Sequence, residues 1–458
     1  MSHSEDKDEQ QQLEDYKRWI SMLPRQFVPY YDANPNEPIM LYQDEMTLRE
    51  RNGYEITSKG TLSAFWFPTP GVRFKLKADP KNPASWFIVR DPLCRLDVPG
   101  LNLSVDVFLT RMTPGIAEGL LNSPTVLGPD SDLAYLQLHI VNFVDYHGEA
   151  IAVTDTRVHT AQLTMENSGW HLTIQLVKDG RKRIERLKKE YGYAITHVAK
   201  LECRHGRALT TDEAIEATHN LNRLFSFIKG ADVASVLTVG FDTSDRKVWE
   251  YWNPLFLGDN AKYPERNWFP HDQPTGLDRL FSGYMDLQAD EAWSEVIDSA
   301  ITWYVKSSCA TSVEVAILFA QMGLELLSWA SFVEVDQKIS ANGFEKLPNA
   351  DRMTLLLSTL LIPTAIPDQL KALQAFARSK NMSSGAEVIA HLRNNIVHPN
   401  LRAKIRVLPS EAQIEAVKLC LWYLELSLLK LCGYHGTYNN RLDTSNRHMC
   451  QPVPWADT

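Results

Sequence analysis

Short stretches in which apolar and polar residues alternate dominate the first half of the chain. They run from about Thr61 to Asn253 and are rich in β-branched and aromatic residues, a pattern that predicts half-buried β-strands. The turn Asn167-Ser168-Gly169 predicts a hairpin between the strands on either side of it. The predicted strands are Thr61–Phe67, Val72–Lys77, Trp86–Val89, Leu101–Thr110, Tyr135–Val144, Val158–Met165, Trp170–Val177, Tyr193–Cys203 and Val236–Phe241.

Two helical patterns interrupt these strands. One is the basic segment Arg181–Lys189, and the other follows Thr210 and Thr211 and continues to about Ile228. Threonine is a favoured residue at the start of a helix, because its side chain can accept a hydrogen bond from a free backbone N–H group. We therefore expect an α+β domain rich in antiparallel strands over residues 21–253.

Helical periodicity takes over in the second half. Residues 254–282 contain four prolines and predict a linker, since proline discourages regular structure. Beyond it, apolar residues recur at helical spacing, so we expect an all-α bundle of four or more helices over residues 283–434. The predicted helices are Glu291–Val305, Val313–Val333, Asp351–Leu361, Asp368–Ser379, Gly385–His398 and Glu411–Cys432.

Helix ends and chain ends complete this picture. Three pairs have the spacing of a capping box, namely Thr311 with Glu314, Ser384 with Glu387, and Ser410 with Gln413. Gly433 lies where a left-handed residue commonly ends a helix. We expect residues 1–20 to be an acidic, disordered N-terminus and residues 435–458 to be a C-terminal tail.

Composition and charge predict a folded cytoplasmic protein. The net charge of −9 argues against a protein that coats nucleic acid by bulk charge, so any RNA contact must be local. Six scattered cysteines predict reduced thiols, and the acidic start does not resemble a signal peptide. Polar residues interrupt the apolar stretch Val315–Val333, so we expect no membrane span.

The segment Ser384–Pro399 carries a stripe of polar residues. Glu387, His391, Asn394 and His398 recur at i, i+4, i+7 and i+11, opposite an apolar arc. On patterning alone, the stripe is the solvated face of an amphipathic helix. Glu387 is then a capping partner, and His398 is the last residue before a proline that ends the helix.

The same segment resembles a known family. Arg393-Asn394-x-x-x-His398 matches the R-x(4–6)-H signature of HEPN domains, which are helical, and it lies late in an all-helical region. The resemblance implies a ribonuclease with Arg393, Asn394 and His398 in its active site. It also implies that RNA is cleaved without a metal or other cofactor to leave a 2′,3′-cyclic phosphate, and that two copies form a homodimer through this domain.

The chemistry of RNA cleavage explains why a histidine and an arginine would serve in such an active site. Attack of the ribose 2′-OH on the adjacent phosphate needs a group that moves protons near neutral pH and a cation that stabilises negative charge at phosphorus. An imidazole such as His398 serves the first role, and a guanidinium such as Arg393 serves the second. Asn394 is placed to hydrogen-bond the imidazole or the RNA backbone.

Polar residues on a second helix are candidates for a supporting role. Gln321 and Glu325 lie on one face of the apolar helix Val313–Val333, where either is a candidate to orient Arg393 or His398. An ordinary structural role is an equally open interpretation. Glu387 and His391 are further supporting candidates, but together with His398 they span three turns, which is too far for a single metal ion.

The basic run Lys178–Lys189 is the best electrostatic candidate for an RNA contact. The residues concerned are Arg181, Lys182, Arg183 and Arg186. Most such runs are solvated helix faces, which is the alternative interpretation.

In domain order, and in the segments Gln321–Leu327 and Arg393–Pro399, the chain resembles the ApeA-type family of antiphage-defence proteins. That resemblance implies a toxic nuclease that acts on tRNA or other cellular RNA during abortive infection, with an N-terminal domain that senses a phage-derived trigger. The competing hypothesis is a non-catalytic HEPN-fold binding module, in which the same helix presents a polar surface to a partner.

Overall fold

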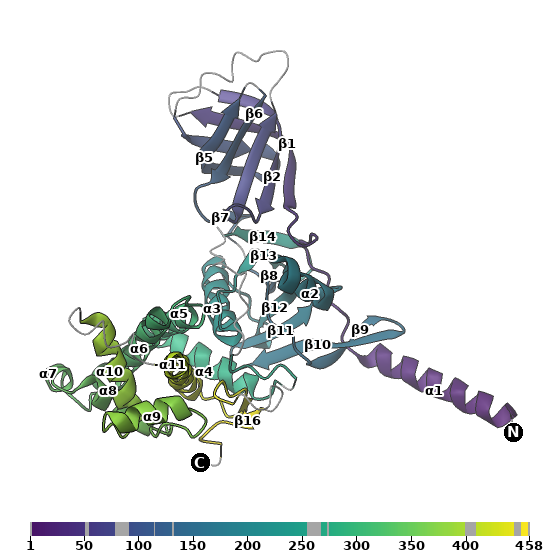
Figure 1. Cartoon of the computed structure of the whole chain (residues 1–458). Helices are drawn as coiled ribbons and strands as arrows, with labels where there is room; N and C mark the ends of the chain where they lie inside the picture. The colour runs from purple at the N-terminus through teal and green to yellow at the C-terminus, as the bar shows by residue number, and fades with distance from the viewer. Residues whose placement is uncertain are drawn as a thin grey trace.

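The computed structural model describes residues 2–50, 55–77, 91–113, 115–130, 132–253, 267–272, 274–398, 409–443 and 450–456. Over these ranges the N-terminal half consists largely of antiparallel strands, and the region from Leu277 to Leu431 is helical (Figure 1). The predicted fold class is therefore confirmed. The predicted strand Trp86–Val89 lies outside the described residues.

The first β-structure is a closed barrel, which we had not predicted. Its strands pair in the order β1-β2-β3-β6-β5-β4, and alternate side chains such as Leu62, Phe74 and Leu96 fill its interior. A short 3₁₀ turn, Pro99–Leu101, joins β4 to β5. The barrel strands are β1 (Ile39–Glu50), β2 (Glu55–Phe65), β3 (Gly71–Lys77), β4 (Leu93–Val98), β5 (Leu103–Thr113) and β6 (Ile116–Leu121).

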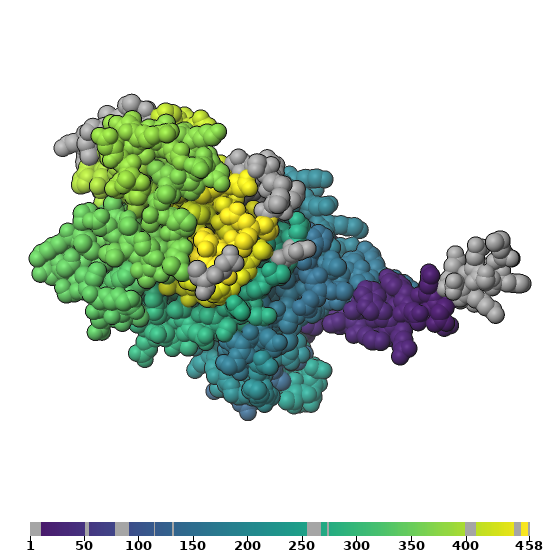
Figure 2. Space-filling model, turned by 90° about the horizontal axis from the view of Figure 1, so that it is seen from below, coloured from purple at the N-terminus to yellow at the C-terminus, as the bar shows by residue number. Residues whose placement is uncertain are grey.

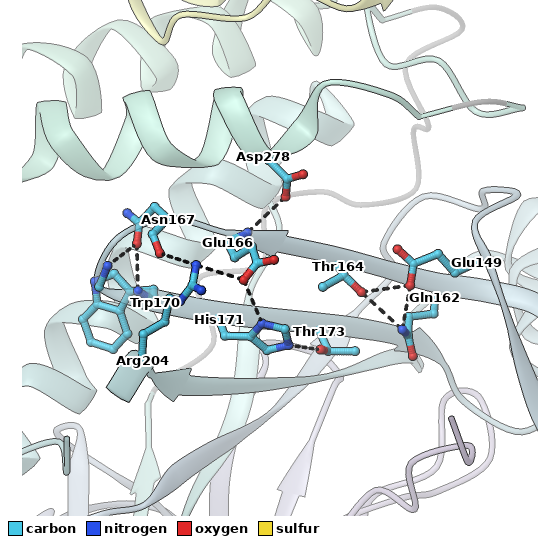
Figure 3. Close-up of polar contacts among 11 residues, drawn as sticks. Glu149, Gln162, Thr164, Glu166, Asn167, Trp170, His171, Thr173, Arg204 and Asp278 are labelled. Carbon is cyan, nitrogen blue, oxygen red and sulfur yellow. Dashed lines mark hydrogen bonds and ion pairs between the residues drawn. The ribbon is translucent and has the colours of Figure 1, made fainter. Parts of the chain in front are cut away.

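The second β-structure is an eight-stranded antiparallel sheet. The hairpin predicted at Asn167 is confirmed, because β10 pairs with β11 and the Asn167 Oδ1 accepts the backbone N–H groups of Gly169 and Trp170 (Figure 3). In spatial order the strands are β7 (Thr125–Leu127), β14 (Lys247–Trp252), β13 (Ser235–Phe241), β8 (Tyr135–Val141), β12 (Ile195–Cys203), β11 (Trp170–Leu176), β10 (Arg157–Glu166) and β9 (Glu149–Thr154).

The two faces of this sheet have different partners. On one face, residues such as Leu138 and Ile174 share a core with helix α3 (Thr211–Lys229) and with the helical half. On the other face, Val198 and Val236 belong to the same apolar cluster as the barrel interior. The sheet therefore connects the barrel to the helices. Helix α2 (Gly180–Glu190) and the 3₁₀ turn Arg204–Gly206 lie in the loops between its strands.

The N-terminal segment crosses the barrel-side face of the sheet in extended form. The phenol of Tyr31 donates to Glu250 Oε2 over 2.5 Å. Three backbone N–H groups of the segment donate to side chains of the sheet: Phe27 to Gln175 Oε1 (2.7 Å), Tyr30 to Gln137 Oε1 (2.6 Å) and Tyr31 to His139 Nε2 (3.1 Å). These side-chain acceptors bind the segment to the face of the sheet, while the N–H of Gln26 and the carbonyl of Pro24 pair with the backbone of Ala152 in the edge strand β9.

Residues 1–20 were predicted to be disordered, and here the structure differs. Helix α1 covers Ser2–Met22 and projects away from the rest of the chain (Figure 1). Its side chains Leu13, Tyr16 and Trp19 are exposed, while Ile20 is buried where the helix meets the body. The acidic composition suggested disorder, but apolar residues at helical spacing favour a helix.

The helical half begins earlier than predicted. Helix α4 starts at Leu277, inside the predicted linker, and the N-cap residue Gly276 has a left-handed φ of 76°. The long helix α6 continues into a π-helical turn, Ala330–Val335. The helices are α4 (Leu277–Ala289), α5 (Ser294–Ser308), α6 (Val313–Trp329), α7 (Ala341–Glu345), α8 (Asn349–Thr359), α9 (Lys371–Ser379), α10 (Gly385–Val397) and α11 (Ser410–Leu431).

Among the described residues, one helix has the length and apolar character of a membrane span, and the structure gives it another role. The segment Val313–Val335 has an 18-residue window with a mean hydropathy of 1.5, but 56% of that window is buried inside the protein. Such burial is typical of a core helix in a bundle.

The six cysteines are all free thiols.

Residues 435–443 and 450–456 belong to the core rather than to a separate tail. Figure 2 shows this segment, in yellow, lying between the helical half and the β-rich half. Trp455 is fully buried and its Nε1 donates to the carbonyl of Tyr434. Arg441 forms a buried ion pair with Glu425 of α11, which also accepts the hydroxyl of Tyr304. Strands β15 (Thr437–Tyr438) and β16 (Gln451–Pro452) form a small sheet within the segment.

The predicted helix caps were only partly correct. The Ser384–Glu387 capping box is present, and Gly433 has a left-handed φ of 66°. The Thr311–Glu314 prediction was wrong, because Ser312 caps α6 by accepting the N–H of Val315. The Ser410–Gln413 prediction was also wrong, since α11 already includes Ser410. Spacing alone did not distinguish neighbouring hydroxyl residues.

Candidate functional site

Helix α10 carries the predicted site. The capping box sets its first turn: Ser384 Oγ accepts the N–H of Glu387 at 3.2 Å. Val388, Ile389 and Leu392 are buried, and the helix packs on α6, α8 and α11. This packing leaves the other side of α10, toward its C-terminal end, facing solvent.

The three predicted active-site residues lie together at that C-terminal end. Arg393 is half-buried, whereas Asn394 and His398 are exposed. Arg393 Nη1 donates to Asn394 Oδ1 over 3.4 Å. Neither Arg393 nor His398 forms an ion pair with another described residue.

The predicted helix Gly385–His398 was one residue too long, because α10 ends at Val397 and His398 lies outside it. His398 is the C-cap of α10, with extended backbone angles of −87° and 118°, and its N–H donates to the carbonyl of Asn394 at 3.0 Å. Residue 399 is proline, which disfavours helical backbone in the residue before it. The imidazole therefore starts from a backbone that turns away from the helix axis.

Arg393 and His398 do not contact each other. A regular helix would separate two side chains five positions apart by about 140° around the axis and about 7.5 Å along it, and His398 departs from that helix at its C-cap. Asn394 also contacts Arg393 rather than the imidazole of His398, among the contacts that the described residues form.

Glu387 and His391 have structural contacts. Glu387 accepts backbone N–H groups of Ser383 and Ser384, which is the capping role expected from the pattern. His391 lies against the ring of Phe376, with 6.0 Å between the ring centroids. Within the described ranges, no three His, Cys, Asp or Glu side chains are arranged to hold a metal ion.

Gln321 and Glu325 interact with each other on α6. The Gln321 Nε2 donates to Glu325 Oε1 at 3.1 Å, and Gln321 is only 1% exposed. Gln321 Oε1 is buried and has no hydrogen-bond partner in the described part of the chain. Helix α6 packs beside α10, but among the described residues neither side chain forms a hydrogen bond or ion pair with Arg393 or His398.

The basic run on α2 is engaged within the protein. Arg183 forms two hydrogen bonds with the carboxylate of Asp32 in the N-terminal segment. Arg181 pairs with Asp145 and also donates to two backbone carbonyls, while Arg186 pairs with Glu190 and Lys182 with Asp179. This geometry favours the structural interpretation of the run over RNA binding.

A second polar arrangement lies where β10 and β11 meet the helical half (Figure 3). His171 lies 3.2 Å from the hydroxyl of Thr173 and 3.6 Å from Glu166, which also pairs with Arg204. Asp278 at the start of α4 accepts the backbone N–H of Glu166 at 3.1 Å. His171 and Glu166 are directly opposite in the sheet, and cross-strand pairs of this kind stabilise it. We assign these contacts to the junction of sheet and helices.

Comparison with known proteins gives two matches to domain families. Residues 128–264 match the YopA central domain, and residues 290–451 match the YopA C-terminal domain. The region between them overlaps the predicted linker 254–282. The second match extends through residue 451, in agreement with the packing of the C-terminal segment into the core.

One curated relative is similar over almost its whole length. It is the SPbeta prophage-derived uncharacterized protein YopA of Bacillus subtilis (strain 168), which is 27% identical over 445 residues, 93% of this chain and 97% of the relative. No solved structure matches this chain.

Proposed function

We propose that the helical half is an endoribonuclease, with Arg393 and His398 as its catalytic residues and Asn394 as a positioning residue. The observation that carries the proposal is that a guanidinium and an imidazole lie at one solvent-facing helix end, with neither held in an ion pair by another described residue. Both groups are therefore available to a phosphodiester.

In this mechanism, the ribose 2′-oxygen attacks phosphorus and the bond to the 5′-oxygen breaks. The 2′-OH loses its proton, the leaving 5′-oxygen gains one, and the products are a 2′,3′-cyclic phosphate and a 5′-hydroxyl. His398 transfers protons in these steps. Arg393 donates to the phosphoryl oxygens, where negative charge increases in the transition state.

A second copy of the chain completes the site in this proposal. Arg393 and His398 form no hydrogen bond or ion pair with each other, and two α10 ends placed face to face would bring the imidazole of one copy beside the guanidinium of the other. The protein then acts as a homodimer through its helical half. Such an isologous arrangement is the commonest form of dimer symmetry.

The biological role follows from the same hypothesis. Cleavage of cellular RNA, including tRNA, would arrest growth during phage infection, and the β-rich half would respond to a phage-derived trigger in the cytoplasm. Similarity to a prophage-derived protein supports a phage-related setting. The competing hypothesis remains a non-catalytic binding module.

Sequencing of RNA ends after a short pulse of expression distinguishes the two hypotheses. The ribonuclease hypothesis expects new 2′,3′-cyclic phosphate ends with the wild type and none above background with Arg393→Ala. Arg378→Ala is a matched control, because Arg378 is an exposed arginine of the neighbouring helix α9. The same RNA ends with wild type and Arg393→Ala would favour the binding module.

A further inference from the structure

A cavity of about 430 Å³ lies where the β-rich half meets the helical half. Its walls come from α3, from the start of β13, from the end of β14 and from α5. Ligand sites in proteins have volumes of this order and often lie between domains. The polar residues that matter most are His219, Asn222, Arg223, Ser235, Tyr251 and Asp298.

One face of α3 forms a wall of the cavity. His219, Asn222, Arg223 and Ser226 are spaced at i, i+3, i+4 and i+7, so they lie along one side of the helix. The capping box of Thr210 and Glu213 fixes the start of this helix. Arg223 forms no ion pair with any residue that the structure describes, although it lines the cavity. It supplies a cation without a fixed partner.

Asn222 adds a donor to the wall of the cavity. Asn222 Oδ1 accepts the backbone N–H of Ser235 at 2.7 Å, which leaves the NH₂ group of Asn222 for another acceptor. Ser235 is 2% exposed and lines the cavity, yet its hydroxyl has no hydrogen-bond partner among the described residues. This oxygen is sealed from solvent, so it is not among the donors that a ligand in the cavity reaches.

The pair His219 and Tyr251 adds another donor. His219 Nε2 lies 3.0 Å from the Tyr251 hydroxyl. Burial raises the pKa of Tyr251, so its hydroxyl keeps its proton, and burial together with Arg223 lowers the pKa of His219. If the tyrosine donates, the imidazole retains an N–H on its other nitrogen. If the imidazole donates, the tyrosine O–H remains. Either arrangement leaves one donor.

An acceptor comes from the helical half. Asp298 of α5 accepts a hydrogen bond from Gln288 Nε2 through its Oδ1 at 2.7 Å. Its other oxygen, Oδ2, is therefore available to accept a hydrogen bond from a ligand hydroxyl. Burial raises the pKa of Asp298, while Gln288, Arg223 and His219 oppose that shift. The second carboxylate of the cavity, Asp232, is already paired with Lys306 at 3.1 Å. The cavity therefore presents a cation with several donors and one available carboxylate oxygen.

We propose that this cavity binds a small phosphorylated metabolite with a hydroxyl-bearing body, such as a nucleoside phosphate or a sugar phosphate. Its phosphate contacts Arg223 and Asn222, and its hydroxyl contacts Asp298. An arginine is well suited to a phosphate because it donates through paired N–H groups. The ligand touches both halves of the protein and so stabilises their junction. This site does not depend on RNA cleavage at α10.

Isothermal titration calorimetry of the full chain with adenosine monophosphate, ribose 5-phosphate, adenosine and inorganic phosphate tests the proposal. We expect the two organic phosphates to bind, and adenosine to bind at least tenfold more weakly than its monophosphate. Arg223→Met lowers the affinity for both organic phosphates at least tenfold. The control Arg246→Gln changes an exposed arginine paired with Asp242 at a sheet turn and leaves binding unaltered.

A second variant tests the hydroxyl contact separately. Asp298→Asn removes a charge near Arg223 with almost no change in shape, so binding of inorganic phosphate is retained or strengthened. The preference for ribose 5-phosphate over inorganic phosphate decreases. The proposal is overturned if none of the phosphates binds the wild type, if adenosine binds as well as its monophosphate, or if Arg223→Met binds like the wild type. An unchanged preference in Asp298→Asn refutes the hydroxyl contact.

Discussion

The buried imidazole of His139 accepts the backbone N–H of Tyr31 at 3.1 Å through Nε2, while its Nδ1 lies 3.0 Å from the carbonyl of Leu237. A carbonyl only accepts, so Nδ1 carries the hydrogen and Nε2 is the unprotonated nitrogen. The contact between the N-terminal segment and the sheet therefore requires a neutral histidine. Protonation of Nε2 would remove the acceptor.

Stability should consequently decrease in mild acid. Burial lowers the pKa of His139 to about 4 and that of His197 to about 3, while both titrate near 6.5 in an unfolded chain. The contribution of these two histidines to the free energy of unfolding is complete above pH 6.5. It decreases as the pH falls from there toward 4, because only the unfolded chain takes up the protons. Each pKa unit corresponds to about 1.4 kcal/mol, so we expect a loss of a few kcal/mol.

Urea unfolding at several pH values between 7.5 and 4.5 measures this loss. The variant His139→Gln has no titrating group at this position and should show a shallower decrease than the wild type. Parallel pH dependences for the two proteins would contradict the assignment of the effect to His139.

The ion pair between Arg441 and Glu425 predicts that the C-terminal segment is essential for stability. Their side chains are 7% and 1% exposed, and the hydroxyl of Tyr304 donates to the same carboxylate. Arg441→Met leaves this carboxylate buried without its cation, which typically costs about 3–5 kcal/mol. The midpoint of chemical unfolding should fall accordingly.

An exposed pair provides the control for this change. Arg246→Met breaks a pair with Asp242 in which the arginine is 76% exposed, and we expect a loss of about 1 kcal/mol or less. If both substitutions lower the free energy of unfolding equally, the C-terminal segment is not buried in the core as the structure indicates.

Two serines at helix starts should respond differently to alanine. Ser384 accepts the N–H of Glu387 and caps α10, so Ser384→Ala should lower stability by about 1 kcal/mol. Ser410 has the same sequence spacing but makes no capping bond in α11, so Ser410→Ala should have little effect. Thermal unfolding of both variants checks the difference, and a larger loss for Ser410→Ala would reverse our assignment.

Local patterns predicted much of the fold, but they did not predict the pairing of strands that are far apart in sequence. The hairpin at Asn167 and the helices of the second half were predictable because alternation and helical spacing are local properties. Barrel closure depends on pairing between β1 and β4, whose partners Leu48 and Leu96 are far apart in sequence. Strand β1 was missed because its centre, Gln43–Glu45, is polar. Helix α4 was missed because prolines precede it.

The candidate sites illustrate the same limit. The sequence placed Arg393, Asn394 and His398 on one helical segment, but the turn of His398 out of the helix depends on its C-cap geometry. The cavity at Arg223 was not predicted, since Asp298 joins it from another helix, 75 positions later. A signal for it did exist, because His219, Asn222 and Arg223 recur at helical spacing on one face of α3.

The most direct test of the central claim is the rate at which purified protein cleaves an RNA oligonucleotide in the presence of a chelator. We expect wild-type protein and Arg378→Ala to produce 2′,3′-cyclic phosphate ends at equal rates. His398→Ala should reduce the rate by about 10²–10⁴, the usual contribution of a general acid–base group, and Arg393→Ala should also reduce it strongly. Absence of cleavage by the wild type at any dimer-forming concentration, or equal cleavage by all four proteins, would contradict the assignment.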